Sequence, residues 1–303
     1  MEQFIVFTGR NLKNYFKDKG AVFFSLLSMI IVICLMTFFL GDMNIESIKN
    51  LLLQFPGRDA VADEKNAELL VFVWTCAGII SINAVTVTMA VYSVMIKDRA
   101  SGRINAIYTS PMSRTAIAGG YIASSFIASV CVCVLTLFAI ELIGVQKGMT
   151  FFPAVIHIRL FGMIAMNSFT YAAFMYLMVL LAKTEGAWSG MGTVIGTLVG
   201  FLGGIYIPVG ALSETVGSII KCTPVIYGTA MFRTVMTEDI LAKTFQGLPD
   251  EVIAEYCDVM GISLKLFGKE IGTLEEWLIL LLCGIIFLIT GVAFLKYSRK
   301  TDR

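Results

Sequence analysis

Six long stretches of the chain carry no charged side chain, and they constrain the fold more than any other feature. Crossing about 30 Å of hydrocarbon takes about 20 residues of α-helix. In lipid, every backbone amide has to bond within its own segment, so apolar runs of this length fold as helices. We therefore expect an all-α membrane protein. The six predicted spans lie at about 21–40, 69–96, 115–140, 160–182, 186–210 and 277–295.

The composition agrees with this class and excludes others. Charged residues make up 15% of the chain, whereas an ordinary soluble domain has about 25%. The 23 lysines and arginines are balanced by 22 acidic residues, so there is no basic excess of the kind that binds nucleic acid. We expect a multi-pass membrane protein with no nucleic-acid partner.

The distribution of basic residues sets the orientation. The head and the tail are both basic, and the positive-inside rule places such ends in the cytoplasm. Six spans satisfy that rule and seven do not. A further apolar stretch at 216–232 is therefore interpreted as re-entrant or interfacial on the outer side. The outer loops are then 41–68 and 214–276, and both termini are cytoplasmic.

The first residues have the pattern of an amphipathic helix. Phe4, Leu12 and Tyr15 recur at helical spacing, and basic residues occupy the other side. We interpret 1–20 as a helix lying in the inner membrane interface against lipid headgroups, followed by a six-span domain at 21–303. The alternative is that this segment acts only as a basic topology determinant.

The loop after the second span, 97–114, is the most distinctive segment. Gly102 can end the preceding helix, and Pro111 stops a short helix that follows it. Apolar side chains on that helix, rimmed by charge, would be exposed to the cytoplasm and available to a partner. The alternative is an ordinary loop with a lipid-facing turn. The apolar face consists of Ile104, Ile107 and Tyr108.

Three motifs together resemble the ABC-2-type transporter permeases. The loop resembles their coupling-helix segment, with Asp98 where glutamate is usual, and with Pro-x-Ser-Arg at its end. The stretch 201–208 resembles their Gly-aromatic-Pro signature. The stretch 224–227 resembles their Asn-Pro-x-x-Tyr motif, with Thr223 in place of the asparagine. The order of the segments also matches over nearly the whole chain.

The resemblance implies the membrane subunit of a bacterial ATP-driven exporter in the plasma membrane. Two such permeases, identical or different, pair with two separate ATPase subunits that bind ATP and magnesium. The chain has no Gly-x-x-x-x-Gly-Lys-[Ser/Thr] loop of its own, so we expect no cofactor in it and no enzymatic activity. The residues expected to couple to the ATPase are Asp98, Gly102, Arg103, Ile104, Ile107, Tyr108, Pro111 and Arg114.

The resemblance also implies that spans two and five line the transport path. The candidates for the path are Trp74, Asn83, Thr86, Thr193, Thr197, Leu198 and Phe201. The threonines could instead bond only to their own helix backbones. The absence of charge deep within the spans suggests an amphiphilic or apolar substrate.

Span five also carries a glycine at every fourth position. A helix face without side chains lets another backbone approach closely. That backbone could belong to the second permease or to the same subunit. The glycines are Gly192, Gly196, Gly200 and Gly204.

A second interpretation comes from another class of protein. The acidic outer loop could bind a peptide, as in a six-span sensor or immunity protein with no ATPase. Enzyme and metal sites are disfavoured because His157 is the one histidine of the chain. Cys222 and Cys257 both lie in the predicted outer loop, where they could form a disulfide or remain free thiols.

Overall fold

The computed structural model describes residues 2–35, 41–266 and 268–301, and it is helical throughout most of that range. One short antiparallel hairpin and a single 3-10 turn (Val209–Ala211) interrupt the helices. The helices are α1 (Glu2–Lys17), α2 (Lys19–Leu35), α3 (Gly41–Leu52), α4 (Ala60–Ala100), α5 (Arg103–Tyr108), α6 (Arg114–Gln146), α7 (Ala154–Leu181), α8 (Glu185–Leu202), α9 (Glu214–Lys221), α10 (Pro224–Thr244), α11 (Asp250–Val259) and α12 (Thr273–Thr301).

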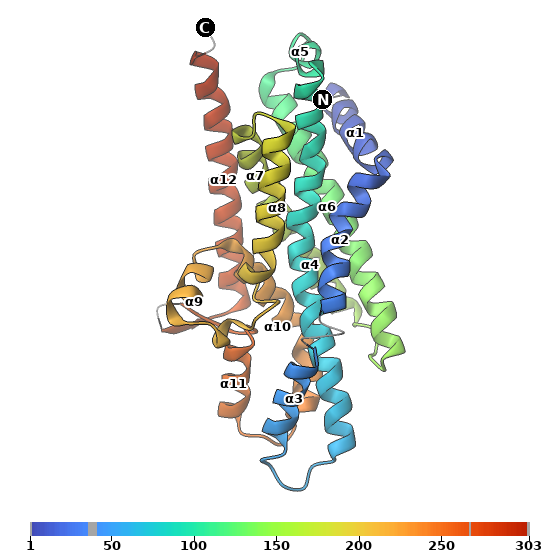
Figure 1. The fold of residues 1–303 in the computed structure, drawn as a ribbon, viewed down its shortest axis with the longest axis vertical. Coiled ribbons are helices and arrows are strands. Elements are labelled where there is room, and N and C mark those ends of the chain that lie inside the picture. The colour runs from blue at the N-terminus through green and yellow to red at the C-terminus, as the bar shows by residue number, and fades with distance from the viewer. Residues whose placement is uncertain (1, 36–40, 267, 302–303) are drawn as a thin grey trace.

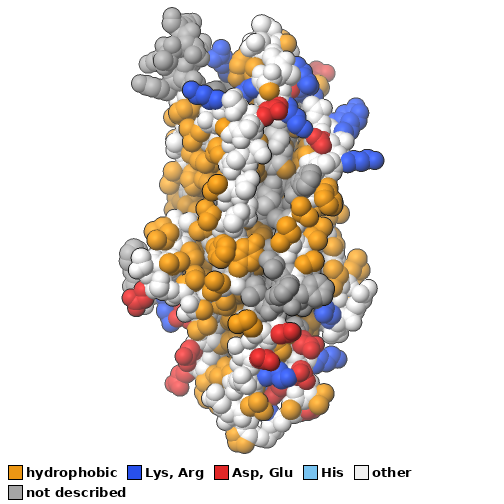
Figure 2. All heavy atoms as spheres, in the orientation of Figure 1, with side chains coloured by type: hydrophobic (Ala, Val, Ile, Leu, Met, Phe, Trp, Pro, Cys, Tyr) orange, Lys and Arg blue, Asp and Glu red, His pale blue; other side chains and the backbone are white. Residues whose placement is uncertain are grey.

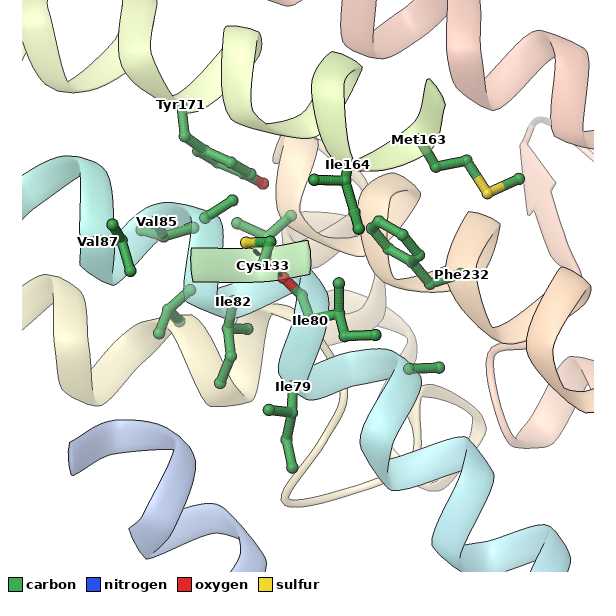
Figure 3. Close-up of a cluster of buried hydrophobic side chains, with 14 of the residues drawn as sticks. Ile79, Ile80, Ile82, Val85, Val87, Cys133, Met163, Ile164, Tyr171 and Phe232 are labelled. Carbon is green, nitrogen blue, oxygen red and sulfur yellow. Dashed lines mark hydrogen bonds between the residues drawn. The ribbon is translucent and has the colours of Figure 1, made fainter. Parts of the chain in front are cut away.

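Helix α4 forms the centre of the molecule. It is 41 residues long, and 89% of its most apolar stretch is buried inside the protein. Helices α2, α3, α6, α7, α8 and α10 all pack against it. Figure 3 shows part of this core, where isoleucines and valines of α4 meet Cys133 of α6, Tyr171 of α7 and Phe232 of α10. Branched side chains of this kind interdigitate at crystal-like density, so the core fixes how these helices sit.

Within the part of the chain that the structure describes, four helices are long and apolar enough to cross a membrane, namely α4, α6, α7 and α12. This supports the all-α membrane class. Two further predicted spans correspond to shorter helices, α2 and α8, which run along α4 (Figure 1). Residues 36–40 of the predicted first span lie outside the described residues.

Helix α8 ends earlier than predicted. The expected span reached residue 210, whereas the helix ends at Leu202. Gly204 then adopts a left-handed conformation with φ of 59°, which side-chain-bearing residues rarely adopt. The chain turns there and leaves the helix axis, so Gly204 is not part of the helical glycine series.

The predicted re-entrant region is a broken pair of helices. Helix α9 ends at Lys221, and Pro224 occupies the first turn of α10, where its missing N–H costs nothing. Helix α10 packs on α4, α12 and α7. After α11 comes the hairpin β1 (Leu264–Leu266) and β2 (Lys269–Ile271), in which Leu264 pairs with Ile271. This hairpin was not predicted from the sequence.

The two ends of the molecule differ. Figure 1 shows that α1 begins, and α12 ends, near the end that carries α5, whereas α3 and α11 lie at the opposite end. Figure 2 shows charged side chains gathered towards both ends of this face, with an apolar region between them. This is the surface that a bilayer requires of a spanning protein.

Candidate functional site

The short helix α5 has the boundaries that the sequence predicts. Helix α4 ends at Ala100, and Gly102 turns the chain with φ of 72°. Helix α5 ends at Tyr108, before Pro111. The hydroxyl of Ser113 then caps α6 by accepting a hydrogen bond from the backbone N–H of Ala116 at 3.2 Å. The sequence therefore specifies a separate one-and-a-half-turn element between two long helices.

Helix α5 has an anchoring face and a free face. Ile104, which was predicted to be exposed to a partner, is instead buried against the core, whereas Asn105 and Ala106 are exposed. Tyr108 is 36% exposed, and the guanidinium of Arg114 lies 4.9 Å from the centre of its ring. A cation over an aromatic face stabilises both side chains. The free face is therefore held in a fixed position while remaining open to a partner.

Asp98, at the end of α4, is the centre of a buried polar cluster. The two terminal nitrogens of Arg10 each donate to one of its oxygens at 2.6 Å, and the hydroxyl of Tyr121 donates at 2.8 Å. Asp98 is 1% exposed, so it cannot contact a partner directly. Arg103 of α5 lies 4.0 Å from the same carboxylate. Asp98 therefore positions α5 relative to α1 and α6.

The contribution of Arg10 was not predicted. It lies 88 residues from Asp98, and no local pattern links two such distant positions. Its hydrogen bonds to Asp98 raise the pKa of the guanidinium above its ordinary value. Bidentate arginine–carboxylate pairs combine charge with fixed geometry, so this pair sets the angle between the two helices.

Helix α1 is amphipathic, as predicted, but its packing face differs from the prediction. Phe7 and Asn11 are buried, whereas Ile5 is 62% exposed. Phe7 packs on Gly120 of α6, where a Cβ atom would lie 2.5 Å from the phenylalanine ring. The buried face therefore contacts protein, while apolar side chains such as Ile5 remain exposed. Next to it, Lys97 pairs with Asp18 at 2.6 Å, which holds the pKa of that carboxyl below its usual value.

A groove of about 870 Å³ runs between α2, α4 and α8. Three predicted path residues, Thr86, Thr193 and Thr197, line it. The hydroxyls of Thr193 and Thr197 donate to carbonyls one turn back on α8, so these threonines line the groove and also bond to their own helix backbone. Leu198 and Phe201 are 48% and 43% exposed on the same helix.

The other four predicted path residues do not line the groove: Leu198 and Phe201 are exposed on α8, and Trp74 and Asn83 are buried. Asn83 is fully buried between helices, and its side-chain amide donates to Thr136 of α6 at 3.1 Å. Trp74 is also fully buried, and its indole N–H donates to the carbonyl of Met260 at 2.9 Å. Neither residue lines the groove. Both hold α4 against neighbouring segments of the same chain.

The glycines of the predicted series have different neighbours. A Cβ on Gly192 would meet the end of Met89 at 2.8 Å, and one on Gly200 would clash with the Tyr206 ring. Both glycines therefore allow close packing within the subunit. A Cβ on Gly196 would meet nothing within 4 Å, so that position is open to another chain or to lipid.

A buried arginine behind the groove was also not predicted. Arg233 of α10 is fully buried, and its guanidinium lies 4.0 Å from the centre of the Trp74 ring. It donates to the carbonyls of Gly204 at 2.8 Å and Met260 at 3.2 Å. A desolvated cation needs such acceptors, so Arg233 ties the end of α8 to α10 and to the segment after α11.

Cys222 and Cys257 are free thiols. Burial raises the pKa of Cys257 to about 11, so its thiol stays protonated at neutral pH. Within the described residues, no group of three or more metal-ligating side chains forms.

The comparisons with known proteins agree with the geometry. The family model described as ABC-2 type transporter matches residues 2–237, which include α1, α5, the groove and most of α10. None of the curated proteins compared with the chain matches it. The matched range covers most of the 303 residues. The chain therefore belongs to the ABC-2 type transporter family.

Proposed function

We propose that this chain is the membrane subunit of an ATP-driven exporter in a bacterial plasma membrane. The observation that carries the proposal is a groove of transport-path size on one side of α4, joined by α4 itself to the exposed helix α5. Helix α4 thus connects the groove, which would lie within the membrane, to the exposed face of α5, which is free for a partner. The sequence has no Gly-x-x-x-x-Gly-Lys-[Ser/Thr] motif, which supports a separate partner ATPase that would bind ATP and magnesium.

The proposed orientation places α5 and both termini in the cytoplasm. Helices α2, α4, α6, α7, α8 and α12 would be the six spans, with α1 in the inner interface among lipid headgroups. Most of the basic side chains of the head and of the 97–114 loop then face the cytoplasm, as the positive-inside rule requires. Helices α3 and α11 would face the outside.

The proposed mechanism is alternating access. ATP would close the ATPase dimer, and the free face of α5, with Tyr108 and Arg114, would follow that movement. The cluster of Asp98, Arg10 and Tyr121 would carry the displacement into α4 and α1, because its hydrogen bonds link α4, α1 and α6. A second permease, identical or different, would close the groove, with the open position at Gly196 near the contact.

Co-purification from native membranes tests this proposal. The solubilised chain should bring an ATPase with it, and Tyr108→Ala together with Arg114→Ala should abolish that association. Lys13→Ala is the matched control because Lys13 is an exposed cation on α1, away from α5. A chain that purifies without any ATPase, under conditions that keep other transporters intact, would support a sensor or immunity protein instead.

A further inference from the structure

A second cavity, distinct from the groove, opens at the end of the molecule that carries α3 and α11. We call it the α3–α11 pocket. Its volume is about 750 Å³, within the range of about 300–1,000 Å³ typical of ligand sites. Helix α3 forms one wall, helix α11 forms another, and the segment 206–211 completes it.

The α3 wall is polar but uncharged. Asn44 and Ser47 line the pocket from one side of α3, and Gln54 lines it just after the helix ends at Leu52. The charged Lys49 is directed elsewhere and pairs with Glu64 of α4. Carboxamides both donate and accept hydrogen bonds, and so do the peptide groups of an extended chain. This wall therefore offers a row of partners for a backbone.

The α11 wall is apolar except for one carboxylate. Val252, Tyr256 and Val259 share a helix face and line the pocket, together with Glu255. Glu255 is the one charged residue of the lining, and it makes no ion pair within the part of the chain that the structure describes. This wall could therefore contact the apolar side chains of a ligand through its valines and pair with one basic group through Glu255.

A buried hydroxyl adjoins the same wall. The phenolic oxygen of Tyr256 is buried and has no hydrogen-bond partner among the described residues. The ring of Tyr256 is packed on Phe245, with the ring centroids 4.7 Å apart. Tyr256 therefore contributes apolar surface to the pocket, while its hydroxyl lies in the protein interior.

We propose that the α3–α11 pocket binds a short amphipathic peptide that carries a basic side chain. Its backbone lies along the carboxamides of α3, its apolar side chains lie on α11, and its basic group pairs with Glu255. This inference rests on the proposed function in one respect: the proposed orientation places the pocket on the extracellular side of the membrane. Binding requires neither ATP nor the ATPase.

Binding to the purified chain in phosphatidylcholine nanodiscs tests the inference. The probe is the dansylated peptide Leu-Lys-Val-Leu-Gly-Leu, compared with the same peptide in which glutamate replaces lysine. We expect the lysine peptide to bind and the glutamate peptide to bind at least about fivefold more weakly. Glu255→Gln should remove that preference, since a partly exposed ion pair is worth up to about fivefold to tenfold in affinity.

Matched controls separate a specific site from general attraction. Glu251→Gln removes an exposed carboxylate from the same helix, outside the pocket, and should leave the affinity unchanged. Asn44→Leu should weaken both peptides, because it removes a backbone partner. Equal losses in Glu251→Gln and Glu255→Gln would overturn the proposal, as would no binding at millimolar peptide or displacement by a neutral oligosaccharide.

Two further measurements keep the outcome clear. Mass photometry of each variant shows whether a second copy of the chain covers the pocket instead of a peptide. In that case Asn44→Leu would reduce the fraction of dimers, and this result would overturn the proposal. Labelling of Ser47→Cys, in an otherwise cysteine-free chain, by an impermeant maleimide on intact cells reports the side of the membrane independently. Failure of ATPase coupling would leave the peptide affinity unchanged, so the two proposals fail separately.

Discussion

Gly200→Ala offers a quantitative test of the packing at the end of α8. A Cβ at this position would lie 2.5 Å from Cζ of Tyr206, whereas ordinary contact begins near 3.4 Å. The ring therefore has to move by about 1 Å, and it is itself packed against Phe201 at 4.9 Å. Overpacking of this kind costs about 1–3 kcal/mol, against a gain of about 1 kcal/mol from helix propensity.

The matched control is Gly196→Ala, one turn earlier on the same helix. Its Cβ meets nothing within 4 Å, so only the propensity gain applies within the subunit. We expect thermal unfolding in nanodiscs to show Gly200→Ala less stable than Gly196→Ala by about 1–3 kcal/mol. Adding Tyr206→Ala should remove most of the penalty of Gly200→Ala, because the two changes share one contact. Equal stabilities of the two alanine variants would refute this packing.

Three other changes test the contacts that position α1 and α4. A double-mutant cycle of Arg10→Ala and Asp98→Ala should give a coupling energy of about 1–3 kcal/mol in unfolding measurements, because the pair is charged and mostly buried. Additive effects of the two substitutions on the free energy of unfolding would contradict this contact. Gly120→Ala should increase amide exchange in α1 more than Gly119→Ala, because the added Cβ would lie 2.5 Å from the Phe7 ring at Gly120 but 3.3 Å from the Phe4 ring at Gly119; equal exchange would count against the packing. Gly228→Ala should lower the unfolding temperature, because its Cβ would lie 2.6 Å from a buried asparagine oxygen; an unchanged temperature would contradict that contact.

Much of the helical layout follows from local signals. Charge-free runs locate the long helices, and the α5 element is bounded by Gly102, Pro111 and the cap at Ser113. These signals succeed because each one acts within a few residues of the chain. The α1 helix is predicted for the same reason, from its periodicity.

The side of each membrane helix that faces protein could not be predicted in this way. An apolar run carries no contrast between faces, so Trp74 and Asn83 looked like path residues although both are buried against other helices. The pairing of Arg10 with Asp98, and the clamp made by Arg233, join segments far apart in sequence. Such contacts depend on the tertiary arrangement, which a single sequence pattern does not contain.

The coupling of the groove to ATP is the central claim, and accessibility of the groove tests it most directly. A cysteine replacing Thr197, in an otherwise cysteine-free chain reconstituted with its ATPase, can be labelled by an impermeant maleimide from the outer face. We predict that labelling increases when ATP is added and that Tyr108→Ala abolishes the increase. A cysteine replacing Leu142, which is 61% exposed on α6, should label equally with and without ATP. Labelling of the Thr197 position that ignores ATP in the intact complex would contradict the account.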